Sequence, residues 1–328
     1  MNYFTTKPNV MAIVIVSLPL AFPAVDTRAQ TPSSAPAATS SVEAILDEAD
    51  VQRKAYIDEF KNLLSRETKF FEIFDKEGRS KRTRRILSTF VVYPLSRSEN
   101  ATAEYRSVVS VDGKAISDAD KRAEDLFAQV AKVESSQKEL EKIQEESSRH
   151  DLELFVSGLT LYQGVTLAEN LRPLFTFTLE GRDQVAGQEV YVIRYQQNRP
   201  SRNISVREDP QTVKGEMSVY YDAGISEKDP NERLSGTLWI TTSNFQILRE
   251  KRTMTVRPEK FENPVTIAEN VFDYQPSAFG ILVPQQITHT QYDLNKKDRS
   301  STMSSRVTFT YDEFTRPDVS VEGEVRSK

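Results

Sequence analysis

The sequence predicts a mainly antiparallel β fold with packed helices (α+β), in which about ten strands form a strongly curved, half-open barrel sheet. Two observations lead to this prediction. From residue 67 onward, short runs in which apolar and polar side chains alternate follow one another, separated by polar turns. Almost no helical segments lie between these runs, which argues against a parallel sheet. A sheet of this size must bury one face, so we expect it to curl around an N-terminal helix.

The clearest alternation lies in residues 234–258. Leu238 and Ile240 point to one side of a predicted strand, and a short polar turn follows at residues 242–244. The alternation resumes at Phe245 and Ile247. Two alternating runs around a short polar turn are the signature of an antiparallel hairpin.

The first 29 residues have the pattern of a secretory signal peptide. Lys7 precedes an apolar run over residues 10–25, which two prolines interrupt, and small residues follow. A membrane anchor is the alternative, but a spanning helix needs roughly 20 apolar residues. We therefore expect residues 1–29 to be removed on export. The product would be periplasmic or secreted, without a transmembrane segment and without a cysteine for acylation.

The rest of the chain divides into a linker and one domain. Residues 30–41 are small, polar and proline-containing, which predicts a flexible linker. Residues 42–328 are predicted to form a single curved-sheet domain, whose first helix begins at a capping box of Ser40 and Glu43. Within it, residues 117–170 are predicted to be a helical insertion. Its charged part up to Arg149 is expected to project into solvent or to form a mobile hairpin.

No signature of catalysis, metal binding or cofactor binding is present. The chain has no cysteine and two histidines, and it lacks the glycine-rich and nucleophile motifs of the common enzyme classes. We therefore predict a non-enzymatic protein with no cofactor and no metal. The net charge of -5 gives no reason to expect a nucleic-acid partner. The basic run at residues 79–85 could bind phosphate-bearing headgroups or an acidic partner, but pairing with acids on neighbouring strands is the simpler interpretation.

Several predicted strands carry apolar side chains on both faces, and such strands either are covered twice or line a pocket. A curved sheet of this size encloses more volume than two helices fill, so we expect an apolar hollow. The side chains predicted to line it and bind ligand are Phe90, Val92, Phe175, Phe177, Tyr191, Ile193, Trp239 and Ile247.

The segment GTLWITTSNFQILREK, residues 236–251, resembles the central hairpin of the outer-membrane lipoprotein-carrier (LolA/LolB-like) superfamily, and GQEVYVIRYQQ, residues 187–197, is similar to the strand before it. The overall pattern is also similar to that of other exported bacterial proteins. The resemblance implies a curved antiparallel sheet with N-terminal helices. It also implies an arginine that holds a lid over the sheet, but the motif does not match that arginine to one position of this chain: Arg84 and Arg249 are the two considered. The chain departs from the family pattern by its greater length and its helical insertion.

These observations predict an exported, non-enzymatic binding or carrier protein that holds an acyl chain or another apolar ligand in a concave β-sheet. Each buried methylene group would contribute about 0.8 kcal/mol to binding. The alternative is a protein-interaction or sensory module of the cell envelope, which would contact a partner protein through the charged helical insertion.

Overall fold

The computed structural model describes residues 41–95, 102–152, 156, 158–206, 216–221, 231–259, 261–295 and 297–316. The predicted signal peptide, and the predicted linker apart from Ser41, lie outside these residues. The helical elements are α1 (Val42–Phe60), α2 (Ala119–Val130), α3 (Ser136–Ser148) and the 3-10 helices η1 (Leu159–Tyr162), η2 (Val165–Leu167) and η3 (Arg172–Leu174). The strands are β1 (Leu64–Phe74), β2 (Ser80–Pro94), β3 (Thr102–Val111), β4 (Lys114–Ala115), β5 (Phe175–Val185), β6 (Gln188–Gln197), β7 (Ile204–Ser205), β8 (Val219–Tyr220), β9 (Arg233–Thr241), β10 (Ile247–Val256), β11 (Val265–Pro276), β12 (Leu282–Asn295) and β13 (Ser300–Tyr311).

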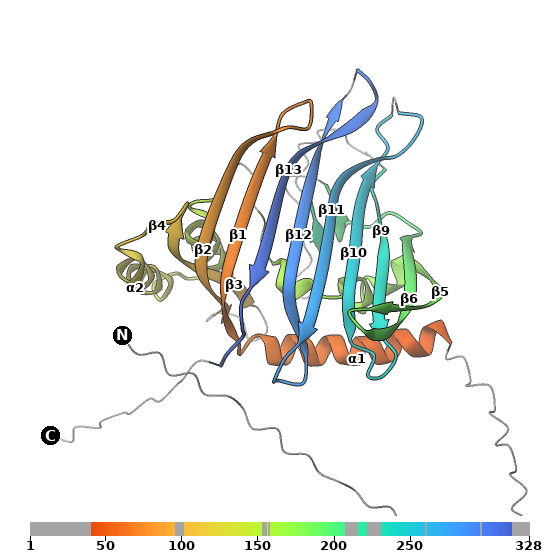
Figure 1. Ribbon diagram of the computed structural model, residues 1–328, viewed down its shortest axis with the longest axis horizontal. Coiled ribbons are helices and arrows are strands. Elements are labelled where there is room, and N and C mark those ends of the chain that lie inside the picture. Colours follow the sequence, from red (N-terminus) through yellow and green to blue (C-terminus); the bar gives the residue numbers. More distant parts are fainter. Residues whose placement is uncertain are drawn as a thin grey trace, which may run out of the picture. The chain divides into compact units, whose positions relative to one another are not determined.

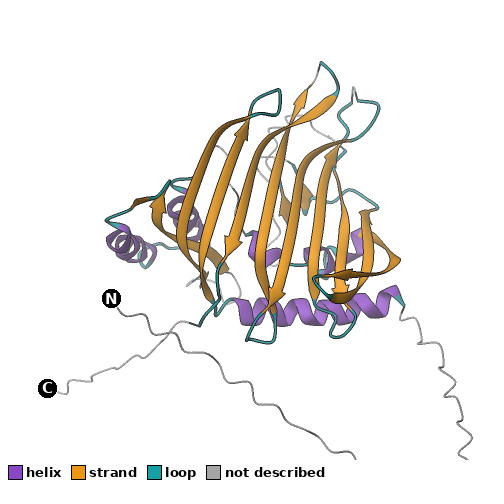
Figure 2. Ribbon diagram, in the orientation of Figure 1, coloured by secondary structure: helices purple, strands orange, loops and turns teal. Residues whose placement is uncertain are grey.

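Eleven of these strands form one open sheet in the order β4-β3-β2-β1-β13-β12-β11-β10-β9-β6-β5. Neighbouring strands in this sheet run antiparallel, and α1 crosses one end of it (Figure 1). Strands β7 and β8 pair separately and in parallel. The predicted fold class is therefore confirmed: the sheet is large, antiparallel and open, and a small number of helices accompany it (Figure 2).

The strand register identifies one face of the sheet as buried. A row of paired residues crosses it from β6 to β2: Ile193, Leu238, Glu250, Phe272, Ile287, Phe309, Lys69 and Ile86. Helix α1 packs on this side, since Ile45 and Ala49 belong to the same core cluster as Ile193. We call this side the inner face and the opposite side the outer face. Because side chains alternate along a strand, residues two apart share a face.

Helix α1 begins one residue later than the predicted cap implies. Ser41 has extended backbone angles, and its hydroxyl oxygen accepts a hydrogen bond from the Ala44 amide at 3.2 Å. A side-chain oxygen at this position satisfies one of the free amides of the first turn. Ser40, the predicted cap, lies outside the described residues.

The expectation that the charged part of the insertion projects into solvent is wrong. Helix α3 packs along β3, where Ile143 is fully buried and the Ser147 hydroxyl accepts a hydrogen bond from the Arg106 amide at 3.1 Å. The 3-10 turns η1 and η2 then replace the helix expected after residue 152. Gly158 and Gly164 precede these turns with φ of 73° and 53°, which a continuous right-handed helix does not allow.

Proline cannot donate to a strand ladder, yet β12 continues through Pro284. Pro284 pairs with Tyr274 where the register with β11 shifts by a bulge. A bulge leaves one residue outside the regular ladder, so the missing N–H of proline costs little there.

Replacing Gly236 by alanine should destabilise the fold by about 1–3 kcal/mol, because there is no room for a Cβ atom. On β9, a Cβ atom there would overlap the Lys251 carbonyl oxygen and the Tyr195 ring. The control is Ser235→Ala on the same strand. Ser235 faces outward, so this substitution should change the free energy of unfolding by less than about 0.5 kcal/mol. Urea denaturation of both variants measures the difference, and equal midpoints would contradict the packing argument.

Candidate ligand-binding face

The structure places seven of the eight predicted ligand-binding residues on the inner face: Phe90, Val92, Phe175, Phe177, Tyr191, Ile193 and Ile247. Trp239 lies on the outer face. It pairs with Val192 and Arg249, and the Arg249 guanidinium lies 6.0 Å from the centre of its ring.

The hollow predicted between these residues is filled by the chain itself. The Phe90 ring lies 6.1 Å from the Phe60 ring of α1 and 5.6 Å from the Tyr311 ring. At the other end of the sheet, Leu167 and Leu171 pack into the core cluster that contains Ile193. We call residues 158–174 the cover segment. Together with α1, the cover segment occupies the inner face that the sequence analysis expected to be open.

Charged side chains also lie on this face, and the sequence analysis did not single them out. Three strands each carry a glutamate two residues before a basic residue, in positions that alternation assigns to the inner face. These pairs are Glu67 and Lys69 on β1, Glu104 and Arg106 on β3, and Glu250 and Arg252 on β10, and all six side chains are buried. The sequence does indicate these residues, because each charge stands at a position where strand alternation predicts an apolar side chain. On β10, for example, Met254 lies on the same face as Glu250 and Arg252.

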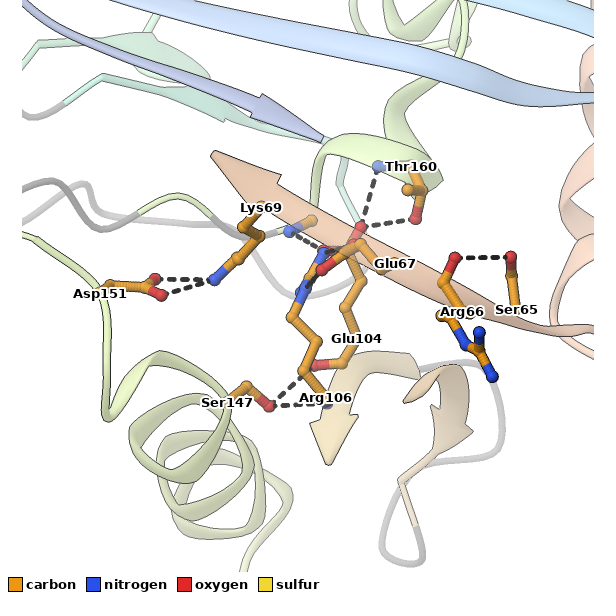
Figure 3. Close-up of polar contacts among 10 residues, drawn as sticks. Ser65, Arg66, Glu67, Lys69, Glu104, Arg106, Ser147, Asp151 and Thr160 are labelled. Atoms are coloured by element: carbon orange, nitrogen blue, oxygen red, sulfur yellow. Dashed lines mark hydrogen bonds and ion pairs between the residues drawn. The ribbon is translucent and has the colours of Figure 1, made fainter. Parts of the chain in front are cut away.

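Arg106 joins two carboxylates at the β1–β3 side of the inner face (Figure 3). Its Nε and Nη2 atoms donate to the two oxygens of Glu67 at 2.7 and 2.9 Å. Its Nη1 atom lies 2.9 Å from Glu104 Oε2. Burial opposes the charge on Glu104, but Arg106 and the Thr160 hydrogen bonds outweigh it and lower the pKa of the carboxyl group. Glu104 therefore remains a carboxylate inside the protein.

Lys69 lies beside this group and holds Asp151. Its Nζ atom is 2.8 Å from both carboxylate oxygens of Asp151 (Figure 3). Burial, reinforced by the charge of Arg106, lowers the pKa of Lys69, and burial raises the pKa of Asp151. Burial thus disfavours the charged form of both partners, and their mutual attraction opposes it.

A second polar group lies on β10. Glu250 accepts a hydrogen bond from the Tyr195 hydroxyl at 2.9 Å and from Arg252 Nε at 3.0 Å. The Arg252 guanidinium also lies 4.8 Å from the centre of the Phe272 ring. Burial opposes the charge of Arg252, but Glu250 reverses this effect and raises the pKa of the guanidinium.

The two polar groups hold the cover segment by its backbone. Glu104 accepts hydrogen bonds from the amides of Gly158 at 2.9 Å and Thr160 at 2.8 Å. Glu250 accepts one from the Gly164 amide at 3.0 Å, and Arg252 donates to the Tyr162 carbonyl oxygen at 2.9 Å. The first part of the cover segment is therefore fixed by charged side chains from opposite halves of the sheet.

The two arginines considered for holding a lid differ in position. Arg84 Nη1 donates to the His150 carbonyl oxygen at 2.8 Å, just before the cover segment. Arg249 lies on the outer face, where it pairs with Asp273 at 2.5 Å. Other bases of the run at residues 79–85 also contact the chain itself, since Arg79 pairs with Asp75 and Arg85 lies over the Phe70 ring.

Two clefts are found beside the described elements. One, of about 230 Å³, lies between α2 and α3 and is lined mainly by charged side chains, among them Arg122, Glu146 and Arg149. The other, of about 470 Å³, lies between α1 and the cover segment, with Leu167 and Pro173 on one wall and Lys54 on the other. In the described residues, no three Asp, Glu or His side chains converge as they would to bind a metal ion.

No protein-family model matches this chain, and no curated protein matches it. Solved structures do match. A DUF1329 family protein from Desulfovibrio piger is 13% identical, with a TM-score of 0.33, over 86% of this chain and 95% of that one. A domain of the outer-membrane lipoprotein-sorting type from Vibrio parahaemolyticus is 10% identical, with a TM-score of 0.35, over 84% and 94%. A LolA superfamily protein from Nitrosomonas europaea is 9% identical, with a TM-score of 0.28, over 85% and 95%.

The resemblance to the lipoprotein-carrier superfamily stays a prediction from the sequence. The chain is an open antiparallel half-barrel whose inner face is closed by a helix and a cover segment. No helix within the described ranges combines the length and apolar character needed to cross a membrane.

Proposed function

We propose that this chain is an exported, non-enzymatic carrier that holds the apolar chain of an amphipathic ligand between the inner face of the sheet and its cover. The observation that carries the proposal is how the inner face is covered. Two large apolar clusters surround the buried charges, and apart from α1 the cover over them consists largely of 3-10 turns. A cover of short turns can move away without breaking a strand of the sheet.

The apolar clusters supply the binding energy in this proposal. Phe175, Ile193 and Ile247 belong to one cluster, and Phe90 and Val92 belong to the other. An acyl chain that replaced part of the cover would gain about 0.8 kcal/mol for each methylene group removed from water. The cleft beside Leu167 and Pro173 is where the cover meets α1, and it offers an entry point for such a chain.

Ligand entry then requires the cover segment to move, and Gly164 provides a way to test this. Its φ is 53°, and a Cβ atom at this position would overlap Ile247 on the sheet. An alanine there costs about 1–2 kcal/mol from the left-handed backbone alone. We expect Gly164→Ala to weaken the docking of the cover and to speed uptake of a fluorescent fatty acid about tenfold, as measured by stopped-flow fluorescence.

Gly78→Ala is the matched control. Gly78 also has a positive φ, of 78°, but a Cβ atom there contacts nothing within 4 Å, so backbone strain is tested without the overlap. Trp239→Phe is a second control. Because Trp239 lies on the outer face, its replacement should leave the affinity for the probe unchanged. If the gently purified protein yields no lipid by mass spectrometry and none of these proteins binds the probe saturably, the carrier proposal fails.

A further inference from the structure

The inner face recognises the backbone of the cover segment as well as its side chains. Between residues 158 and 164, the amides of Gly158, Thr160 and Gly164 donate to carboxylates of the sheet. In the same stretch, Arg252 donates to the carbonyl oxygen of Tyr162. Acceptors and a donor are thus spaced along the sheet to match a short peptide in the turn conformation of residues 158–164.

A purely apolar ligand would not replace these contacts. Glu104 and Glu250 are buried, and each would lose hydrogen-bond donors if residues 158–164 moved away without a substitute. A buried acceptor without a partner is unfavourable, and more so when it is charged. A ligand that brings its own amide groups to the same positions restores the contacts. The buried charges of the inner face therefore favour a peptide over a bare hydrocarbon chain.

The sheet also restricts which side chains fit. The Thr160 hydroxyl donates to Glu104 Oε1 at 2.6 Å, so a hydroxyl residue is preferred at that position. Four residues later, Gly164 has a positive φ of 53°, and a Cβ atom there would push against the end of the Ile247 side chain, so glycine is favoured at that position. The glycine at residue 158 has a different cause, because a Cβ atom there would lie 2.8 Å from the Tyr162 ring of the cover itself. The pattern selected by the sheet is Ser or Thr followed four residues later by Gly.

We propose that the strip formed by Glu104, Glu250 and Arg252 is a peptide-binding surface, on which a segment of a partner protein with this pattern can take the place of residues 158–164. The chain's own cover segment then acts as an internal competitor for that surface. The inference rests on the proposed function in one respect, namely that the cover segment can leave the sheet.

The test uses a fluorescein-labelled peptide of residues 156–166 and the full-length chain. Fluorescence anisotropy is measured with the wild-type protein and with Gly164→Ala and Gly78→Ala. We expect Gly164→Ala to bind the peptide saturably and at least about tenfold more tightly than the other two, because its own cover competes less well. Peptides carrying Thr160→Val or Gly164→Val should each bind about tenfold more weakly than the native peptide.

Hydrogen exchange of residues 158–164 in Gly164→Ala establishes whether the cover has loosened. Faster exchange with no saturable peptide binding overturns the inference, and so does binding that is indifferent to both peptide substitutions. If hydrogen exchange of residues 158–164 is unchanged both in Gly164→Ala and in the protein variant Gly164→Val, the inference is also overturned, since the cover segment then does not leave the sheet. Uptake of the fatty-acid probe without peptide binding leaves the carrier proposal standing, whereas peptide binding without probe uptake supports the peptide surface alone.

Discussion

Replacing Arg106 by methionine should lower the free energy of unfolding by about 3–5 kcal/mol, the cost of leaving buried charges without their partner. Arg106 is buried and joins Glu67 and Glu104, neither of which has access to water. Methionine keeps the volume of the side chain approximately but supplies no donor, so two carboxylates remain uncompensated. Urea denaturation followed by circular dichroism measures the loss.

The control for this prediction is an ion pair on the outer face. Arg194 lies 2.6 Å from Glu180, and its side chain is 64% exposed. Since exposed pairs contribute little, Arg194→Met should cost less than about 0.5 kcal/mol. Adding Glu67→Gln to Arg106→Met should recover part of the loss, because one of the two unpaired carboxylates is removed. Equal stability of Arg106→Met and Arg194→Met would show that the inner network is not the source of stability assigned to it.

Acidification should destabilise the fold through His289, by about 3 kcal/mol at most. His289 is buried on β12, stacks on Tyr221, and has its Nδ1 atom 2.5 Å from Asn270 Oδ1. Burial lowers the pKa of its imidazole from 6.5 to about 4, because the charged form is unfavourable away from water. The folded protein therefore keeps His289 neutral under conditions in which the unfolded chain takes up a proton.

The direction of this pH effect on stability follows from the difference in proton binding between the folded and unfolded states. As the pH falls from 6.5 to about 4, the unfolded state binds a proton at His289 that the folded state does not, so stability declines across this interval. Above it His289 contributes no pH dependence, and below it the contribution is constant. The measurement is the denaturation midpoint as a function of pH for the wild-type chain and for His289→Gln. Other groups titrate alike in both proteins, so parallel curves would contradict a buried neutral histidine.

The outcome at β12 shows what local pattern can and cannot predict. Alternating apolar residues correctly indicated a strand around Ile287, because period-two burial is a property of the strand itself. The bulge opposite Tyr274 that accommodates Pro284 depends on the neighbouring strand, so local pattern does not reveal it. The same limit applies to α3, whose burial of Ile143 depends on its position along β3.

For the candidate site too, the features set by local alternation could be predicted and those set by distant strands could not. Phe90 and Ile193 could be assigned to a buried face because alternation is local. Trp239 was assigned to the same face as Ile193, although the register places it on the other side. The buried charges were missed because some of their hydrogen-bond donors come from far along the chain: Gly158 donates to Glu104 across 54 positions, and Gly164 donates to Glu250 across 86.

By itself, the sequence determined that the chain folds into an open antiparallel sheet with a helix at its start, since side-chain periodicity and turn residues act over a few positions. Only the tertiary structure decided that the inner face is closed, and by which residues. The sequence predicts helix up to residue 170, but segment 158–174 forms 3-10 turns and is held by charges that strands distant in the sequence bring together. The buried network around Arg106 and Arg252 exists only when those strands pair, because burial is what makes an unpartnered charge costly.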